Sequence, residues 1–165
     1  MGLFSGINYE EYAEEFDFYS LLGIDKESYG DVSAKKIHPA DYSVDSSIME
    51  AYPAELDDLV RLHYLIRKFK VITALEIGAG KSTIVIADAV KRNHEEYSSF
   101  IDNNLRKNNA FELHSIETNQ FYADEVLRNL SSDLRPYVHL TVAGCKMATV
   151  NSRIWLDLNR KLHNM

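Results

Sequence analysis

Residues 75–83 read LEIGAGKST and follow a short apolar run, so they stand where a strand passes into a helix. Such a turn can bind a ligand, because glycines let the backbone approach closely and the N–H groups that open a helix attract anions. Glu76 adds a carboxylate before the turn, and Ser82 and Thr83 add hydroxyl groups after it. The stretch predicts a ligand-binding turn, and the spacing of its glycines discriminates between ligands.

A nucleoside triphosphate is one alternative, because residues 80–82 (GKS) match the end of the phosphate-binding pattern G-x-x-x-x-G-K-[S/T]. The first glycine of that pattern falls on Leu75, inside the apolar run. The turn is then too short to wrap a phosphate with its backbone N–H groups. This mismatch disfavours a triphosphate as the ligand.

A dinucleotide is a second alternative, since the pattern G-x-G-x-x-G aligns with Gly78, Gly80 and Thr83. The third glycine of the pattern allows the helix to pack closely on the strand, and a threonine is a departure from it. The acidic residue expected about 20 residues further on has no clear counterpart, because Asp88 lies within the predicted helix. A dinucleotide is therefore disfavoured as well.

A second acidic residue, Glu117, ends the next strand-like run, FELHSIE at residues 111–117. A carboxylate has acceptors only, so Glu117 can receive both hydroxyl protons of a ribose. A third run, YVHLTVAG, ends at Gly144. In open α/β sheets ligands bind at the carboxyl ends of the strands, so these positions and the turn predict one shared site.

These motifs resemble those of class I S-adenosylmethionine-dependent methyltransferases, over about residues 70–145. In that family an acidic residue and G-x-G end the first strand, and an acidic residue ending the second strand holds the ribose hydroxyls. The resemblance implies S-adenosylmethionine as cofactor, with the backbone of residues 81–83 facing its carboxylate and Glu76 its ammonium. The implied cofactor-binding residues are Glu76, Gly78, Ala79, Gly80, Lys81, Ser82, Thr83, Glu117 and Gly144. The acidic or amide residue that the family often places near Gly144 is absent.

The resemblance implies a methyltransferase of which the chain carries the N-terminal, cofactor-binding half. Catalysis in that family rests largely on positioning and desolvation, and no catalytic residue stands out here. The methyl acceptor is unknown, with a small molecule favoured. A second hypothesis is a non-catalytic or truncated half-domain that acts through self-association or a partner. A third is a plain connecting turn, with Glu117 capping the next helix.

Hydrophobic periodicity predicts helices and strands in alternation. The helices are expected at residues 8–22, 53–69, 82–92 and 120–130, and the strands at 71–77, 111–117 and 137–144. The first strand is apolar throughout and is expected to be buried on both faces, whereas the third alternates and suits a sheet edge. This order predicts an α/β fold with a parallel sheet of spatial order 3-2-1, half of a Rossmann-like doubly wound fold.

We divide the chain into a helix-and-loop extension (1–52), the cofactor-binding half-domain (53–145) and a helical tail (146–165). The tail is predicted helical because of the spacing of its apolar residues, which are Met147, Val150, Ile154, Trp155, Leu158 and Leu162. Residues 93–110 read as a polar insertion, and loop 23–50 is the one long segment that offers an acceptor site. A half-sheet leaves an apolar strand edge unpaired, which leaves three alternatives: the chain is a fragment, it forms a homodimer through that edge, or its N-terminal segment covers the edge.

Composition argues against several kinds of partner. A net charge of −7 over 165 residues disfavours a nucleic-acid surface. No apolar run approaches the roughly 20 residues of a membrane helix. The single cysteine, Cys145, and the absence of a signal pattern favour a cytoplasmic protein. The six histidines show no metal-ligand spacing, so no metal is expected.

Overall fold

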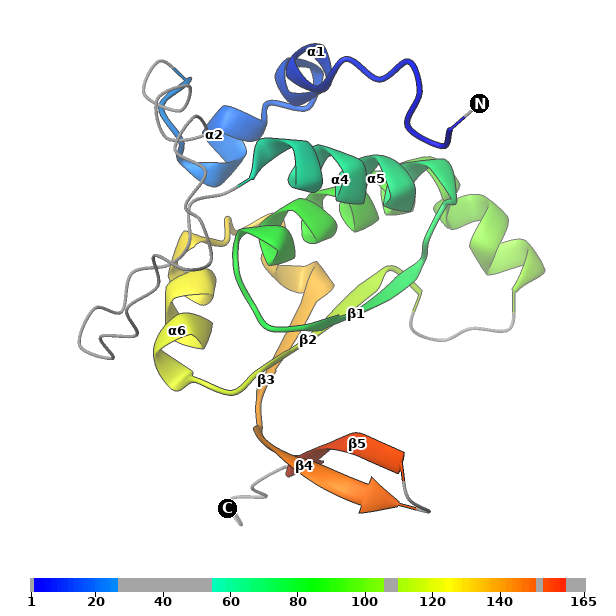
Figure 1. Cartoon of the computed structure of the whole chain (residues 1–165). Helices are drawn as coiled ribbons and strands as arrows, with labels where there is room; N and C mark the ends of the chain where they lie inside the picture. The colour runs from blue at the N-terminus through cyan, green and yellow to red at the C-terminus, as the bar shows by residue number, and fades with distance from the viewer. Residues whose placement is uncertain (1, 27–54, 106–109, 151–152, 160–165) are drawn as a thin grey trace.

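The computed structural model describes residues 2–26, 55–105, 110–150 and 153–159. Three strands form a parallel sheet in the order β1-β2-β3, which confirms the predicted α/β fold and strand order (Figure 1). The bounds are Thr73–Ile77 for β1, Glu112–Glu117 for β2 and Val138–Val142 for β3. Residues 27–50, which are most of the loop proposed as the acceptor site, lie outside the described residues. So do Pro53, at the start of the predicted helix 53–69, and Leu162, in the predicted helical tail.

Helices connect the strands, as the alternating pattern predicts. They are α4 (Leu56–Lys68), α5 (Lys81–Asn104) and α6 (Gln120–Asn129), and a short 3₁₀ helix, η2 (Arg135–Tyr137), precedes β3. Figure 1 shows α4 and α5 side by side on one face of the sheet. The core lies between these helices and β2, with Val60, Val85 and Leu113 fully buried. No helix in the described part of the chain is long and apolar enough to cross a membrane.

The expectation that β1 is buried on both faces is wrong. The side chains of Leu75 and Ile77 are 68% and 62% exposed, whereas Glu76 between them is buried. The described helices pack on the face to which Glu76 belongs, so the opposite face lacks a helical cover within the described residues. We call this face, which carries Leu75, Ile77 and their β2 neighbours His114 and Ile116, the open face.

The predicted helix over residues 8–22 is divided into α1 (Tyr9–Glu15) and α2 (Phe18–Leu22). Asn8 caps α1 by accepting hydrogen bonds from two backbone N–H groups of the first turn. The break lies at Asp17, whose φ of 52° is left-handed, a conformation that aspartate tolerates better than most residues. The change in direction buries Phe18 completely.

A buried chain of hydrogen bonds joins the N-terminal helices to α4 and α5. The Tyr12 hydroxyl lies 2.8 Å from Nδ1 of His63, and Nε2 of His63 lies 3.0 Å from Oδ2 of Asp88. Arg92 donates from Nε to the same Asp88 oxygen at 2.6 Å. The ring of Phe18 packs edge-on against His63. This chain links α1 to α5 through α4.

The predicted polar insertion at residues 93–110 is wrong for residues 93–104, which continue α5. The helix extends because two of its side chains pack on the core: Ile101 is buried and Tyr97 partly so. Asn93 is also buried, and its amide donates to the carbonyl groups of Ile66 and Val71. A polar sequence here therefore stabilises the connection from α4 to β1.

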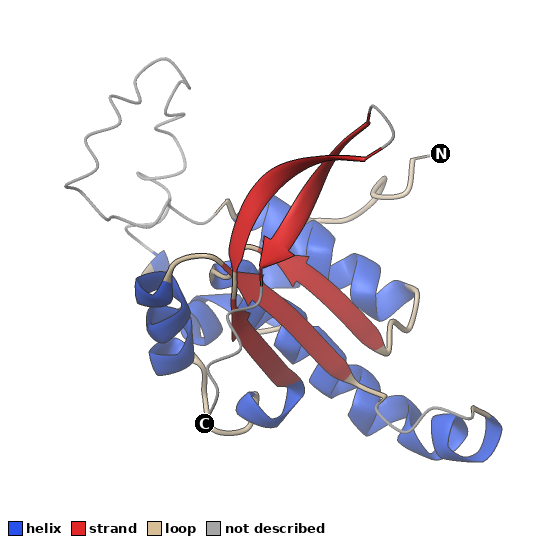
Figure 2. Ribbon diagram, turned by 90° about the horizontal axis from the view of Figure 1, so that it is seen from below, coloured by secondary structure: helices blue, strands red, loops and turns tan. Residues whose placement is uncertain are grey.

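The predicted C-terminal helix is wrong. In the described part of the tail, β4 (Gly144–Val150) and β5 (Arg153–Asn159) form an antiparallel hairpin, while residues 160–165 lie outside the described residues. Several residues of the hairpin are β-branched or aromatic, including Ile154 and Trp155, and such residues favour strands over helices. Figure 2 shows the hairpin leaving the sheet at the carboxyl ends of the three strands.

Candidate cofactor site

The turn after β1 consists of Gly78, Ala79 and Gly80, and α5 begins directly behind it. Gly78 has a φ of +91°, which residues with a Cβ rarely adopt, so the turn requires glycine there. Its N–H donates to the Ile116 carbonyl at 2.8 Å, and the Ala79 N–H donates to Oε2 of Glu117 at 2.8 Å. The turn is thereby fixed against the end of β2.

Glu117 is the residue that joins the two predicted motifs. Besides the Ala79 N–H, its carboxylate accepts the N–H groups of Thr118 at 2.7 Å and Asn119 at 2.9 Å through Oε1. Burial acts to raise the pKa of Glu117, but these backbone hydrogen bonds outweigh it and leave the pKa below its usual value. The carboxylate is therefore ionised at neutral pH, and Oε2 keeps acceptor capacity beyond Ala79.

Glu76 lies on β1 with its side chain turned toward α5, where it is only 9% exposed. Three hydroxyl groups donate to its carboxylate: Ser82 to Oε1 at 2.6 Å, and Thr83 and Ser115 to Oε2 at 2.7 Å each. These hydrogen bonds satisfy a buried carboxylate that would otherwise be costly to desolvate. Glu76 therefore connects β1 to β2 and to the first turn of α5.

The start of α5 supplies donors beside the turn. The Gly80 N–H donates to Oγ1 of Thr83 at 2.9 Å, and the Thr83 N–H donates to the Gly80 carbonyl at 3.1 Å. The first N–H groups of any α-helix lack partners within the helix and carry partial positive charge. In α5 these belong to Lys81 and Ser82, so the helix begins with an anion-attracting end.

The glycines border open space. A Cβ built on Gly78 or Gly80 would meet no atom within 4 Å. Gly80 has a φ of −173°, an extended conformation that any residue adopts, so its backbone does not require glycine. Because neither glycine has a side chain, the backbone itself faces this space, and a flat ligand could approach it closely.

The last predicted site residue, Gly144, follows β3 and opens β4. The N–H of its neighbour Ala143 donates to the Glu117 carbonyl at 2.8 Å, which places Gly144 next to the end of β2. Of the predicted residues, eight cluster at the turn and the end of β2, and Gly144 extends the cluster to the third strand. Lys81 forms no ion pair with the described residues.

Two residues at the site escaped sequence reasoning. Ser115 is fully buried and donates to Glu76, while Asn119 both caps α6 and donates its N–H to Glu117. A signal for Ser115 is present, because it is a polar residue two positions after the apolar Leu113, on the same side of the strand. A buried hydroxyl requires a partner, and that requirement points to the carboxylate of the neighbouring strand.

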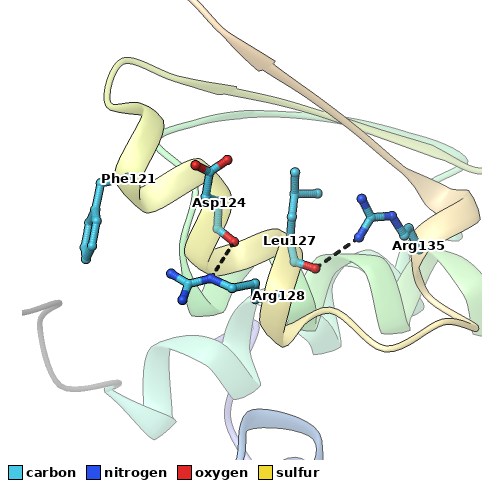
Figure 3. A pocket seen from close by; sticks show the side chains of 5 residues that line it. All are labelled: Phe121, Asp124, Leu127, Arg128 and Arg135. Carbon is cyan, nitrogen blue, oxygen red and sulfur yellow. Dashed lines mark hydrogen bonds between the residues drawn. The ribbon is translucent and has the colours of Figure 1, made fainter.

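A shallow pocket also lies along α6, and none of the predicted site residues line it (Figure 3). Its two guanidinium groups are engaged with the helix itself: Arg128 donates to the Asp124 carbonyl at 3.3 Å and Arg135 to the Leu127 carbonyl at 3.1 Å. These bonds satisfy main-chain carbonyls of α6, so the arginines here stabilise the helix.

No group of three or more His, Cys, Asp or Glu side chains is placed to hold a metal ion within the described segments. Comparison with known protein families, with curated proteins and with solved structures finds no match.

Proposed function

We propose that the chain binds S-adenosylmethionine at the carboxyl ends of β1 and β2, as the cofactor-binding part of a class I methyltransferase. The observation that carries the proposal is the contact between Glu117 and the turn after β1. The Ala79 N–H donates to Oε2 of Glu117 at 2.8 Å, across a separation of 38 residues in the chain. The acidic residue that would bind the ribose thus contacts the glycine turn that would bind the rest of the ligand.

Each part of the ligand has a matching group. Oε2 of Glu117 retains a lone pair for a ribose hydroxyl, and Gly144 at the neighbouring strand end borders the adenine side. The opening N–H groups of α5 attract the carboxylate of the methionine part. When bound, S-adenosylmethionine supplies an electrophilic methyl group for in-line transfer to an acceptor, for which we favour a small molecule.

The length of the turn supports this ligand over a nucleoside triphosphate. Three residues separate β1 from α5, whereas a triphosphate loop needs several more backbone N–H groups to surround its phosphates. The carboxylate of Glu117 at the turn also disfavours a phosphate by charge repulsion. S-adenosylmethionine carries no phosphate, so a short turn beside an acidic residue suits it.

Calorimetric titration with S-adenosylmethionine tests the proposal. We expect micromolar affinity for the wild type and a loss of about tenfold or more in Glu117→Ala, which is about 1.4 kcal/mol. Glu112→Ala is the matched control, because Glu112 lies on the same strand at the opposite end and contacts His114. No binding by a folded, monodisperse wild type would refute the cofactor assignment.

A second candidate function is self-association through β1, and the open face favours it. Leu75 and Ile77 are exposed on a strand that pairs, among the described strands, with β2 alone. An apolar strand edge promotes pairing with another chain, and two copies related by a two-fold axis would pair β1 with β1 in antiparallel orientation. Sedimentation velocity across a range of concentrations distinguishes a discrete dimer from a monomer.

A further inference from the structure

We infer that Glu76 is a positioning residue, which orients the turn through the hydroxyl of Thr83 and does not contact the ammonium of the ligand. This inference rests on the proposed function, because the turn is taken to be the cofactor-binding turn. It assigns Glu76 a role different from the one that its place in the motif implies.

The Glu76 carboxylate has few hydrogen-bond acceptor sites left for a ligand. A carboxylate offers about four acceptor sites, and Ser82, Thr83 and Ser115 occupy three of them at 2.6–2.7 Å. Thr83 and Ser115 are fully buried, and Glu76 is 9% exposed. The one acceptor site that remains is on Oε1 beside Ser82, on a carboxylate that is itself buried, so the protein's own hydroxyl groups are the main partners of Glu76.

The direction of the Thr83 hydrogen bonds gives Glu76 its influence on the turn. A carboxylate accepts only, so the Thr83 hydroxyl must donate its one proton to Oε2 of Glu76. The lone pairs of Oγ1 then point away from that bond, and one of them accepts the Gly80 N–H at 2.9 Å. Glu76 therefore fixes the orientation of the Gly80 peptide through a single intermediate hydroxyl.

The turn is consequently held by two carboxylates in two different ways. Glu117 accepts the Ala79 N–H directly, and Glu76 holds the Gly80 N–H through Thr83. Ser115 of β2 donates to the same Glu76 carboxylate, so this hydrogen bond also fixes the distance between the ends of β1 and β2. The bare backbone at Gly80 can receive a ligand only if this peptide keeps its orientation.

The first experiment needs no ligand. Amide hydrogen exchange measured by NMR reports the Gly80 and Ala79 N–H groups separately. In Thr83→Val and in Glu76→Leu we expect exchange of the Gly80 amide to accelerate by about tenfold or more, with little change at Ala79, which Glu117 protects. Thr83→Ser keeps a hydroxyl and should retain wild-type protection. Unchanged exchange at Gly80 in Thr83→Val, an isosteric variant expected to fold, would overturn the inference.

The second experiment compares two ligands, S-adenosylmethionine and 5′-methylthioadenosine, which lacks the ammonium and carboxylate. A positioning residue needs only an acceptor oxygen, so Glu76→Gln should keep both affinities within about threefold of the wild type. Thr83→Val should lower both affinities by a similar factor. A loss of about tenfold or more in Glu76→Gln for S-adenosylmethionine alone would identify a direct ammonium contact and overturn the inference.

The two experiments separate this inference from the proposed function. Binding of neither ligand by the wild type would refute the cofactor assignment. The exchange of the Gly80 amide would still decide whether Glu76 and Thr83 orient the turn, because that measurement uses the protein alone.

Discussion

Nε2 of His63, on α4, lies 3.0 Å from Oδ2 of Asp88, on α5, and both side chains are buried. The other ring nitrogen of His63 faces the Tyr12 hydroxyl of α1 at 2.8 Å. With the proton on Nε2, the ring donates to Asp88 and accepts from Tyr12, so one neutral imidazole satisfies both neighbours. The attachment of the N-terminal helices therefore depends on one buried, titratable side chain.

Tyr12→Phe should reduce the free energy of unfolding by about 1–3 kcal/mol, because it leaves the buried Nδ1 of His63 without a donor. Chemical denaturation monitored by circular dichroism measures this change. Tyr9→Phe, on the same helix, is the matched control: its hydroxyl accepts from the Nε of Arg61, which water can reach. The control should stay within about 0.5 kcal/mol of the wild type. Equal losses in the two variants would contradict a special role for the His63 contact.

Stability should fall as the pH is lowered through about 6.5. Burial lowers the pKa of His63 below its usual value, and the hydrogen bond that His63 donates to Asp88 offsets this only in part. The unfolded chain then binds the proton more readily than the folded chain, so folding loses free energy below the unfolded pKa of about 6.5. Denaturation midpoints between pH 7.5 and pH 5 measure the slope. In His63→Gln the slope should be reduced.

Asp88 acts in a separate range of pH. Burial tends to raise its pKa, but the hydrogen bonds from His63 and Arg92 prevail and lower it below the usual value of 3.8. Its contribution to stability is thus present above pH 3.8 and is lost only at more acidic pH. A loss of stability between pH 7 and pH 5 that persists unchanged in His63→Gln would therefore contradict the role given to His63.

Affinity for S-adenosylmethionine should stay level from pH 8 to pH 5. The pKa of Glu117 lies below its usual value of 4.5, because three backbone N–H groups outweigh the effect of burial. In the proposed complex the carboxylate remains the acceptor for a ribose hydroxyl throughout this range, and affinity should decline only at pH values below 4.5. Titrations at pH 7.5, 6 and 5 on folded protein provide the measurement. A marked decline between pH 7.5 and pH 6 would conflict with this assignment.

Charged substitutions on the open face should suppress self-association. In the combined variant Leu75→Lys and Ile77→Lys, like charges would meet across a two-fold axis, and we expect a shift toward monomer of about tenfold or more in dissociation constant. Phe100→Lys is the control, because Phe100 is 63% exposed on α5. Sedimentation velocity compares the three proteins. A wild type that is monomeric at high concentration would exclude a dimer through β1.

The placement of the nine predicted residues could be read from the sequence because its main determinants are local. The change from an apolar run to G-x-G fixes where β1 ends, and a parallel sheet then brings Glu117, at the end of β2, to the same edge as Gly78. The strand order follows from the alternation of helices and strands. The nine predicted residues therefore lie at the carboxyl edge of the sheet, although the ligand they bind stays a prediction.

The parts that the sequence did not predict depend on packing between distant segments. Met147, Ile154 and Leu158 fit a helical stripe as well as a hairpin, because strand pairing depends on a register that periodicity does not determine. The role of Ser115 depends on its position opposite Glu76, which the register of β1 and β2 decides. The break at Asp17 similarly arises from the burial of Phe18.

The two proposed functions use opposite faces of the sheet. Glu76 and Glu117 extend from the face on which the helices pack, while Leu75 and Ile77 extend from the open face. Since successive side chains of a strand alternate between faces, Leu75, Glu76 and Ile77 belong in turn to the proposed assembly surface, the proposed ligand site and the assembly surface again. Under the two proposals, selection could alter how the chain assembles without altering the ligand that it holds, one residue at a time along a single strand.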